Sequence, residues 1–284
     1  MTIHCFRTVH CIYYNPGSEK AVTIARRGQE NGLKCVEVSR SGLDTLCREV
    51  DRYKGRHVHQ GIVADVSRLH YYPLDYRVPQ LSLTPSPHDK GDHISSASPV
   101  WVLLCSVRDP GNLGSIVRTC YYLGVTRLVV TGARCQLSSV VSKASSGTLE
   151  CVNVWAARDA VTMINDKLEQ GWRVLAADIP DYYTNMEEND LEEADTVISD
   201  DNVINAVSVD SVTPSERATL LVLGSEGSGI PSDILSIVQE RIYVPSSPLV
   251  HPSVDSLNVS VAAGIIIHKL CQHLRNKPHK TYQP

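Results

Sequence analysis

Three short segments of the chain combine glycine with polar side chains of the kinds that bind ligands and stabilise charge. The first, residues 109–119, contains Asn112 and Arg118. An arginine at the start of a helix can clamp a phosphate or stabilise an oxyanion, and Asn112 suits the N-cap of that helix. Because Arg118 follows Asn112 by six residues, we expect both to share one side of the helix start. A cap plus a surface ion pair is the simpler interpretation of this segment alone.

The second segment, residues 224–231, reads Gly-Ser-Glu-Gly-Ser-Gly-Ile-Pro. Its glycines expose backbone N–H and C=O groups to a ligand. It is not a Walker phosphate loop, because no Gly-Lys-Ser/Thr follows, and its GxxGxG spacing differs from the GxGxxG of dinucleotide-binding folds. The carboxylate of Glu226 would repel a phosphate, which favours a neutral or cationic ligand. The alternative is a glycine turn with Pro231 at a helix start.

The third segment, residues 254–264, begins with polar residues and continues into small and apolar ones. Ser256 offers a hydroxyl and Asn258 an amide for hydrogen bonds to a ligand. The small residues that follow predict a tightly packed helix. Taken alone, helix capping is the better interpretation of the two polar residues.

The elements that must position these segments alternate between strands and helices, which predicts an α/β fold. From residue 100 to about residue 275 the strands are nearly continuous apolar runs, typical of a parallel sheet covered on both faces. We predict strands at 101–107, 127–131, 151–155, 172–177, 219–223 and 241–244, and helices at 113–123, 140–147, 159–169, 232–238 and 257–274. Ligands of such sheets bind at the carboxyl ends of the strands, so the loops after Val107, Leu223 and Val244 are the candidate site.

A smaller α/β unit precedes this region, at residues 1–70. We predict strands at 9–14, 34–39 and 61–66 and helices at 19–31 and 43–53, a size near the lower limit for an independent core. Residues 71–99 hold five of the fifteen prolines and no useful periodicity, so we expect a linker there. The acidic residues 182–210 predict a mobile insert within the larger unit, which spans residues 100–276, and residues 277–284 a tail.

Charge is divided unevenly between the two units. The whole chain has a net charge of −4, but residues 1–70 hold 11 basic and 7 acidic residues, a net of +4. The remaining residues carry a net of −8, and residues 178–201 contribute ten carboxylates without a single Lys or Arg. The basic unit favours an anionic partner for the first domain. A chance asymmetry on a solvated surface is the alternative.

Cysteine usage and hydropathy exclude several classes of protein. The nine cysteines are odd in number, widely spaced and contain no CxxC, which argues against a zinc site or a disulfide framework. We expect cysteines such as Cys105 and Cys151 to be small core residues, and the compartment to be reducing. No secretory signal peptide or clear transit peptide is visible, and no run of about 18 apolar residues predicts a membrane span.

Together, and in this order, the three segments resemble the signature motifs of the SpoU (TrmH-like) class of the SPOUT superfamily, the trefoil-knotted RNA 2′-O-ribose methyltransferases. The resemblance covers residues 100–275. Residues 59–64 resemble the end of the ribosomal-protein-L30e-like RNA-binding domain that precedes the knot in rRNA-modifying members. Residues 141–147, Val-Ser-Lys-Ala-Ser-Ser-Gly, are most similar to mitochondrial members that modify large-subunit rRNA.

The resemblance implies S-adenosyl-L-methionine as the cofactor, no metal, rRNA of the large ribosomal subunit as the partner, a homodimer and a mitochondrial matrix location. The implied catalytic residues are Asn112, Arg118, Glu226, Ser256 and Asn258. The implied cofactor-binding residues are Leu223, Gly224, Val244 and Leu257. For RNA binding by the first unit we expect the basic residues Arg26, Arg27, Arg48, Arg52, Lys54 and Arg56.

The implied reaction is an in-line displacement, in which a ribose 2′-oxygen attacks the methyl carbon of a sulfonium, and it is mainly a problem of alignment. A guanidinium titrates above about 12 and rarely loses its proton, so we expect Arg118 to hold the adjacent RNA phosphate and to stabilise the developing alkoxide rather than act as the base. Asn112 and Ser256 would orient Arg118 and the ribose. Glu226 and Asn258 would shape the loops and the environment of the sulfonium.

The sequence departs from the family pattern in two ways. The small domain starts near the family's second strand, which predicts a truncated start. A truncated start would affect RNA affinity more than catalysis. Residues 245–252 lengthen the loop before the third segment.

A tRNA ribose 2′-O-methyltransferase is the alternative within the class, and a non-catalytic RNA-binding ribosome-assembly factor is the alternative outside it. The lack of a Walker lysine and of a metal-ligand cluster disfavours a nucleotide hydrolase.

Overall fold

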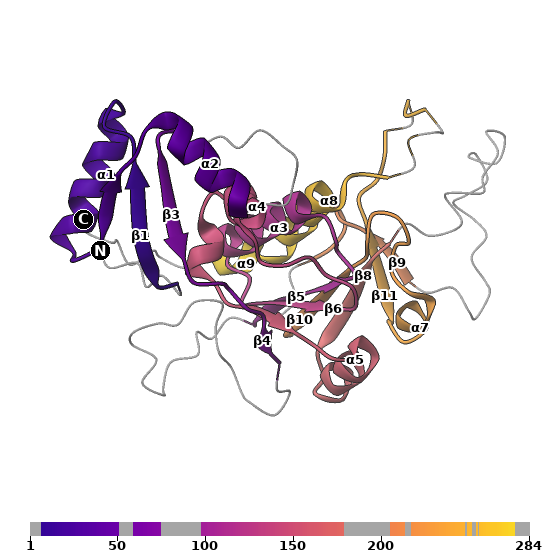
Figure 1. The fold of residues 1–284 in the computed structure, drawn as a ribbon. Coiled ribbons are helices and arrows are strands. Elements are labelled where there is room, and N and C mark those ends of the chain that lie inside the picture. The colour runs from indigo at the N-terminus through magenta and orange to yellow at the C-terminus, as the bar shows by residue number, and fades with distance from the viewer. Residues whose placement is uncertain are drawn as a thin grey trace. The chain divides into compact units, whose positions relative to one another are not determined.

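The computed structural model describes residues 7–50, 59–74, 98–178, 205–213, 217–247, 249–251, 254 and 256–275. The chain divides between Leu69 and His70 into two compact units. Figure 1 shows the helices and strands of both units along the chain.

The smaller unit is a three-stranded sheet with two helices. Its elements are β1 (Val9–Tyr14), α1 (Glu19–Glu30), β2 (Cys35–Glu37), α2 (Arg40–Val50) and β3 (Ile62–Val66). β1 lies in the centre, parallel to β2 and antiparallel to β3. Ser18 caps α1 by accepting a hydrogen bond from the Ala21 amide, and this places Ala21 and Ala25 against Tyr14 of the central strand. The core of this unit is small, as its length predicts.

The larger unit contains one eight-stranded sheet in which every pair of neighbours is parallel. Its strands are β4 (Tyr72–Pro73), β5 (Val100–Cys105), β6 (Arg127–Thr131), β7 (Val154–Ala156), β8 (Arg173–Ala177), β9 (Asn205–Ser208), β10 (Thr219–Leu223) and β11 (Glu240–Tyr243). Its helices are α3 (Pro110–Leu123), α4 (Ser139–Ala144), the 3-10 helix η1 (Thr148–Cys151), α5 (Ala160–Glu169), α7 (Ser232–Leu235), α8 (Val259–Leu270) and α9 (Gln272–Arg275). The predicted α/β class with a large parallel sheet is confirmed.

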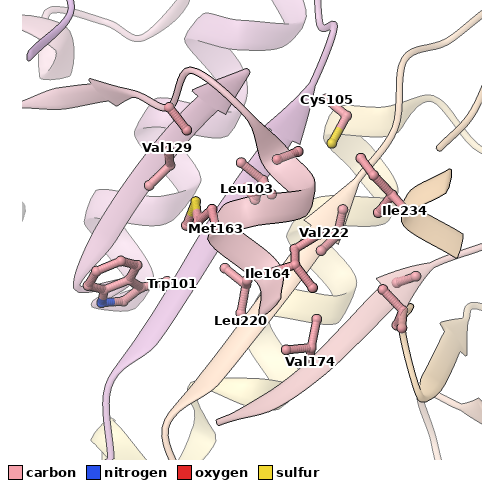
Figure 2. Packing of buried hydrophobic residues seen from close by; sticks show 14 of the residues in the cluster. Trp101, Leu103, Cys105, Val129, Met163, Ile164, Val174, Leu220, Val222 and Ile234 are labelled. Carbon is pink, nitrogen blue, oxygen red and sulfur yellow. The ribbon is translucent and has the colours of Figure 1, made fainter. Parts of the chain in front are cut away.

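Strands β5, β6 and β10 are buried along their whole length, because helices cover the sheet on both faces. Figure 1 shows α5 and α7 on one side of the sheet and α3, α4 and α8 on the other. On the first side Met163 and Ile164 of α5 pack with Leu103, Val222 and their neighbours in one buried cluster (Figure 2). Apolar side chains therefore point to both faces, which explains the continuous hydrophobic runs in the sequence.

The strand order is β4-β7-β6-β5-β10-β8-β11-β9, and it contains one reversal that matters for binding. From β5 the chain adds β6 and then β7 in one direction, but the helix α5 carries it back to β8 on the other side of β5. β10 later inserts between β5 and β8. Loops that leave β5 and β10 at such a reversal diverge and leave room for a ligand between them.

The three tryptophans of the chain lie around two buried cations. The Arg127 guanidinium lies 4.3 Å from the Trp101 ring centroid and 4.8 Å from that of Trp155. Lys167 Nζ lies 4.7 Å from the Trp101 ring and 5.0 Å from Trp172. Burial lowers the pKa of both cations, and the faces of the aromatic rings offset part of that cost.

Two segments expected to lack regular structure contribute strands. Tyr72 and Pro73, at the start of the predicted linker, pair with β7, and the Tyr72 ring packs 5.5 Å from that of Trp155. Asn205–Ser208, at the end of the predicted mobile insert, forms β9 beside β11. Both predictions are wrong at these positions, since an edge strand of two to four residues is too short to show a periodicity. Residues 75–97 and 179–204 lie outside the described residues.

A cysteine prediction also fails in part. Cys105 is buried at the end of β5, and burial raises the pKa of its thiol to about 12. Cys151, however, ends the 3-10 helix η1 and is half-buried, because the strand begins three residues later than predicted.

Helix α3 approaches α4 closely at a glycine. A Cβ on Gly114 would lie 2.5 Å from the Cβ of Ala144 and 2.7 Å from the carbonyl oxygen of Val141. Any side chain there would push α4 away from α3. The turn after α4 contacts a residue of the candidate site, so this packing also determines the site.

We predict that Gly114→Ala lowers the free energy of unfolding by about 1–3 kcal/mol, the usual cost of overpacking a filled core. Urea unfolding followed by circular dichroism measures the change. Ser115→Ala is the matched control, because it alters the neighbouring position of the same helix without adding an atom to the α3–α4 contact. An equal loss of stability in both variants, or none in Gly114→Ala, would contradict the packing described.

Candidate functional site

The first segment starts its helix three residues earlier than predicted. Asp109 is the N-cap of α3, and its carboxylate accepts a hydrogen bond from the backbone N–H of Asn112 at 2.7 Å. Pro110 follows in the first turn, where a missing N–H has no cost. The prediction of Asn112 as the N-cap is therefore wrong. Because Asp109 caps the helix, the side chain of Asn112 is available for other contacts.

Asn112 joins the three segments in one hydrogen-bonded chain. Its Nδ2 donates to the carboxylate of Glu226, and its Oδ1 accepts from Asn258 Nδ2 at 3.1 Å. Glu226 lies 114 residues further along the chain, and Asn258 lies 146 residues further. A side-chain amide can donate and accept at once, whereas a carboxylate only accepts. An asparagine is thus the residue type that can bridge these two partners.

Asn258 has two roles in this arrangement. It is the N-cap of α8, where its Oδ1 accepts from the Ser260 amide at 2.9 Å and from the Ser260 hydroxyl at 2.6 Å. Its Nδ2 is the donor to Asn112. Asn258 can therefore cap α8 and belong to the site at the same time, and its hydrogen bonds to Ser260 fix the plane of its side-chain amide.

The second segment folds back on itself directly after β10. The amide and carbonyl groups of Ser225 and Gly229 bond each other reciprocally at 3.0 and 3.1 Å. A Cβ on the buried Gly224 would lie 2.2 Å from the carbonyl carbon of Gly229, so no other residue fits there. This tight loop carries the exposed Glu226 toward Asn112.

Arg118 lies on α3 but does not share the side of Asn112. At about 100° per residue, six residues place two side chains about 120° apart around a helix, so the expectation of one shared side is wrong. The exposed Arg118 side chain donates from Nη1 to the hydroxyl of Ser146 at 2.8 Å. It borders a hollow of about 360 Å³ lined by Arg118, Thr119, Tyr122 and Leu123.

Ser146 is a site residue that was not predicted. It adopts a left-handed conformation, with φ of 53°, in the turn between α4 and η1. Ser145 holds that turn through its buried hydroxyl, which donates to the Ser142 carbonyl at 2.9 Å and accepts from the Leu149 amide at 3.1 Å. The Ser-Ser-Gly sequence indicates a turn, but nothing in it indicates a partner 28 residues earlier.

The loop after β6 lies beside the first two segments and is tied to the residues that precede the sheet. The Tyr71 hydroxyl donates to the carbonyl of Cys135 at 2.7 Å. Burial raises the pKa of the Cys135 thiol, and the negative charges of Asp109 and Glu226 raise it further. Burial also raises the pKa of Tyr71, so its hydroxyl stays protonated and remains a donor.

The other predicted residues are distributed as follows. Leu223 is buried at the end of β10, Val244 follows β11 half-buried, and Leu257 is exposed just before α8. Ser256, also exposed, lies two residues before Asn258. On the smaller unit the predicted RNA contacts Arg26, Arg27 and Arg48 are exposed on α1 and α2. Arg52, Lys54 and Arg56 lie outside the described residues.

In the described part of the chain, no group of three His, Cys, Asp or Glu residues is arranged to hold a metal ion. Among these same residues no helix has the length and apolar character needed to cross a membrane.

Comparisons with known proteins identify the family of the larger unit. A profile of the SpoU rRNA Methylase family matches residues 99–268. The human protein named "rRNA methyltransferase 1, mitochondrial" is 30% identical over 263 residues, which cover 91% of this chain and 65% of the human one. The Schizosaccharomyces pombe protein of the same name is 29% identical, covering 84% of this chain and 74% of its own.

The chain thus spans about two thirds of the human relative. Among solved structures, an AdoMet-bound rRNA methyltransferase from Sinorhizobium meliloti has a TM-score of 0.61 at 20% identity, covering 95% of this chain and 82% of its own. The SpoU methyltransferase AviRb from Streptomyces viridochromogenes, in complex with AdoMet, has a TM-score of 0.61 at 17% identity over 95% of this chain and 84% of its own. These two structures establish a common fold. With a profile match over more than half of its length, this chain belongs to the SpoU rRNA methylase family.

Proposed function

We propose that the protein is an S-adenosyl-L-methionine-dependent RNA 2′-O-ribose methyltransferase that acts on a guanosine of mitochondrial large-subunit rRNA. The observation that carries this proposal is the hydrogen-bonded chain through Glu226, Asn112 and Asn258, which joins three distant segments at the carboxyl ends of β5 and β10. The names of the human and Schizosaccharomyces pombe relatives support an rRNA substrate and a location in mitochondria, for which we propose the matrix.

The residues at the reversal of strand order fit the proposed cofactor. In the tight loop after β10, Gly227 and Gly229 are exposed and no atom would lie within 4 Å of a Cβ there. Val244 and Leu257 offer apolar surface on the neighbouring segments, and Leu223 is the buried last residue of β10. The exposed carboxylate of Glu226 favours a cationic ligand over an anionic one. We therefore assign Leu223, Gly224, Val244 and Leu257 to cofactor binding. S-adenosyl-L-methionine would supply a methyl group already activated on a sulfonium, so the chemistry requires no metal.

Arg118 is the residue best suited to meet the RNA. One of its guanidinium nitrogens donates to Ser146, and the remaining donors of the fork can reach a phosphate next to the target ribose. The positive charge of the guanidinium would stabilise the negative charge that develops on the 2′-oxygen. Ser146 is a positioning residue for Arg118, and Ser256 would orient the ribose. Asn112, Glu226 and Asn258 keep the loops in register.

A second part of the proposal concerns assembly. α3 and α8 pack against each other and expose a set of apolar side chains, which are Tyr121, Tyr122, Val261 and Ile265. Tyr122 is 86% exposed, which is unusual for so large a side chain. We propose that a second copy of the chain covers this surface in a homodimer, and that the C-terminal part of the larger unit forms the trefoil knot of the family.

The smaller unit is proposed to bind RNA. Its basic side chains Arg26, Arg27 and Arg48 are exposed, and the unit as a whole carries a net charge of +4. We propose that it is the L30e-like domain of the rRNA-modifying members. This domain distinguishes an rRNA substrate from the tRNA substrate of the alternative function.

The central experiment combines calorimetric titration with S-adenosyl-L-methionine and methyl transfer to protein-free large-subunit rRNA. We expect the wild type to bind the cofactor and to methylate a ribose 2′-oxygen. Arg118→Lys should lower turnover by about 100-fold or more, because an ammonium cannot replace the bidentate fork, while cofactor affinity stays the same. Ser146→Ala should lower turnover by a smaller factor and also leave cofactor affinity unchanged.

Three results would contradict this proposal. Cofactor binding without methyl transfer to any RNA would favour the non-catalytic assembly factor. Methylation of tRNA but not of rRNA would favour the alternative substrate. Near-wild-type turnover of Arg118→Lys would exclude the bidentate clamp. Mapping ribose methylation in rRNA after loss of the protein identifies the target nucleotide.

The loop at Gly224 provides a separate prediction. Gly224→Ala should abolish measurable binding of S-adenosyl-L-methionine, because its methyl group would collide with the backbone of Gly229 and force the loop open. Gly227→Ala is the matched control, since a Cβ there meets nothing within 4 Å. Both affinities are measured by calorimetry. If the two variants bind equally well, the loop does not form part of the cofactor pocket.

The proposed dimer can be tested with a matched pair of substitutions. Ile265→Glu on α8 should convert the dimer to a monomer, because it places a charge in the apolar surface. Ile24→Glu on α1 is the control, since Ile24 is exposed to a similar extent, 48% against 39%. Sedimentation velocity measures the mass of each variant. A dimer that survives Ile265→Glu, or that Ile24→Glu also disrupts, would argue against this interface.

A further inference from the structure

Three neighbouring strands of the large sheet are each followed by an exposed arginine. Arg108 follows β5, Arg134 follows β6 and Arg158 follows β7. These strands are adjacent and parallel, so the three arginines leave the same edge of the sheet. We refer to Arg108, Arg134 and Arg158 as the arginine row.

The register of the strands relates the positions of the three arginines. Cys105 pairs with Thr131, and Arg108 and Arg134 each follow three residues later. On the other side of β6, the amide of Ala157 donates to the carbonyl of Val130, and Arg158 is the next residue. Neighbouring strands lie about 4.8 Å apart, so the three arginines follow adjacent strand ends, two or three residues beyond the last residue of each strand.

Arg134 is held in place before any ligand binds. Its guanidinium lies 5.2 Å from the ring centroid of Tyr71, and its Nη1 donates to the Gly132 carbonyl at 3.3 Å. The Tyr71 hydroxyl in turn bonds the carbonyl of Cys135, the residue next to Arg134. Proteins that bind single-stranded nucleic acids also combine aromatic rings, on which bases stack, with cations that contact the phosphates.

The two carboxylates that follow arginines of the row in sequence accept hydrogen bonds from backbone amides. Asp109 caps α3 by accepting from the Asn112 amide, and Asp159 caps α5 by accepting from the Thr162 amide at 2.7 Å. Hydrogen bonds from the side chain of Thr162 and from its backbone amide lower the pKa of Asp159. Within the described residues, no ion pair joins a carboxylate to any arginine of the row. Their guanidinium groups are therefore available to an anionic ligand.

The row also has a direction. In the order β7, β6, β5 it leads to β10, whose loop carries Glu226 to Asn112. We propose that the arginine row binds successive phosphates of the single-stranded RNA segment next to the target nucleotide, and leads that strand to Arg118. This inference rests on the proposed function for the identity of the ligand. It adds a binding surface on the catalytic unit that is separate from the basic residues of the smaller unit.

The test measures binding of the full-length protein to a single-stranded RNA oligonucleotide of mixed sequence, by fluorescence anisotropy over a range of salt concentrations. Each contact with a single strand contributes about 0.7 to the slope of log K against log salt, so replacing all three arginines by glutamine should reduce the slope by about 2. Affinity at low salt should fall by about tenfold or more. Single variants should each reduce the slope by about 0.7.

Arg217→Gln is the matched control. Arg217 is exposed and lies two residues before β10, at the opposite edge of the sheet, so this change removes the same charge without touching the row. It should leave the slope unchanged. Thermal unfolding of each variant verifies that the fold is retained.

The outcomes separate this inference from the proposed function. An unchanged slope in the triple variant, or an equal reduction in Arg217→Gln, would exclude RNA binding by the arginine row, whether or not the protein transfers a methyl group. Cofactor titration of the triple variant should match the wild type, because no residue of the row lies in the segments assigned to the cofactor. Binding of RNA through the row by a wild type that transfers no methyl group would overturn the proposed function and leave the row intact.

Discussion

One side-chain amide holds the site of this protein together. Asn112 donates to Glu226 and accepts from Asn258, so it connects its own loop to two others that lie more than a hundred residues further along the chain. Two contacts fix the orientation of this amide. The backbone N–H of Asn112 donates to Asp109, and the capping of α8 fixes Asn258, which donates to the Asn112 side chain. Loss of either partner would leave the amide half-satisfied and release the loops from one another.

The bridge can form only because of the strand order. β10 inserts next to β5, which brings the Gly-rich loop of the second segment beside the start of α3. The two strands are buried along their whole length, so their carboxyl ends are held rigidly by the core. A rigid sheet thus supports loops that would otherwise be free to move, and Gly224 provides the close approach that keeps the second loop compact.

The same edge of the sheet has two chemically different halves. On the β10 side, glycine, a carboxylate and apolar residues favour a cationic, partly apolar ligand. On the side of β5, β6 and β7, the exposed cations Arg108, Arg134 and Arg158 favour a polyanion. Arg118 is anchored by Ser146 on α3, the helix that Asp109 caps and that follows β5. A reaction between a sulfonium donor and a nucleic acid requires such a division.

The sequence by itself determined the α/β class, most elements of the large sheet and the residue types of the three segments, because buried parallel strands and glycine loops leave local patterns. It did not determine β4 or β9, which are edge strands of four residues or fewer, or the cap at Asp109. The contacts of Asn112 with Glu226 and Asn258, and of Arg118 with Ser146, were decided by tertiary structure alone. Hydrogen bonds between residues 28 to 146 positions apart depend on strand order and helix rotation, and neither is encoded in a local pattern.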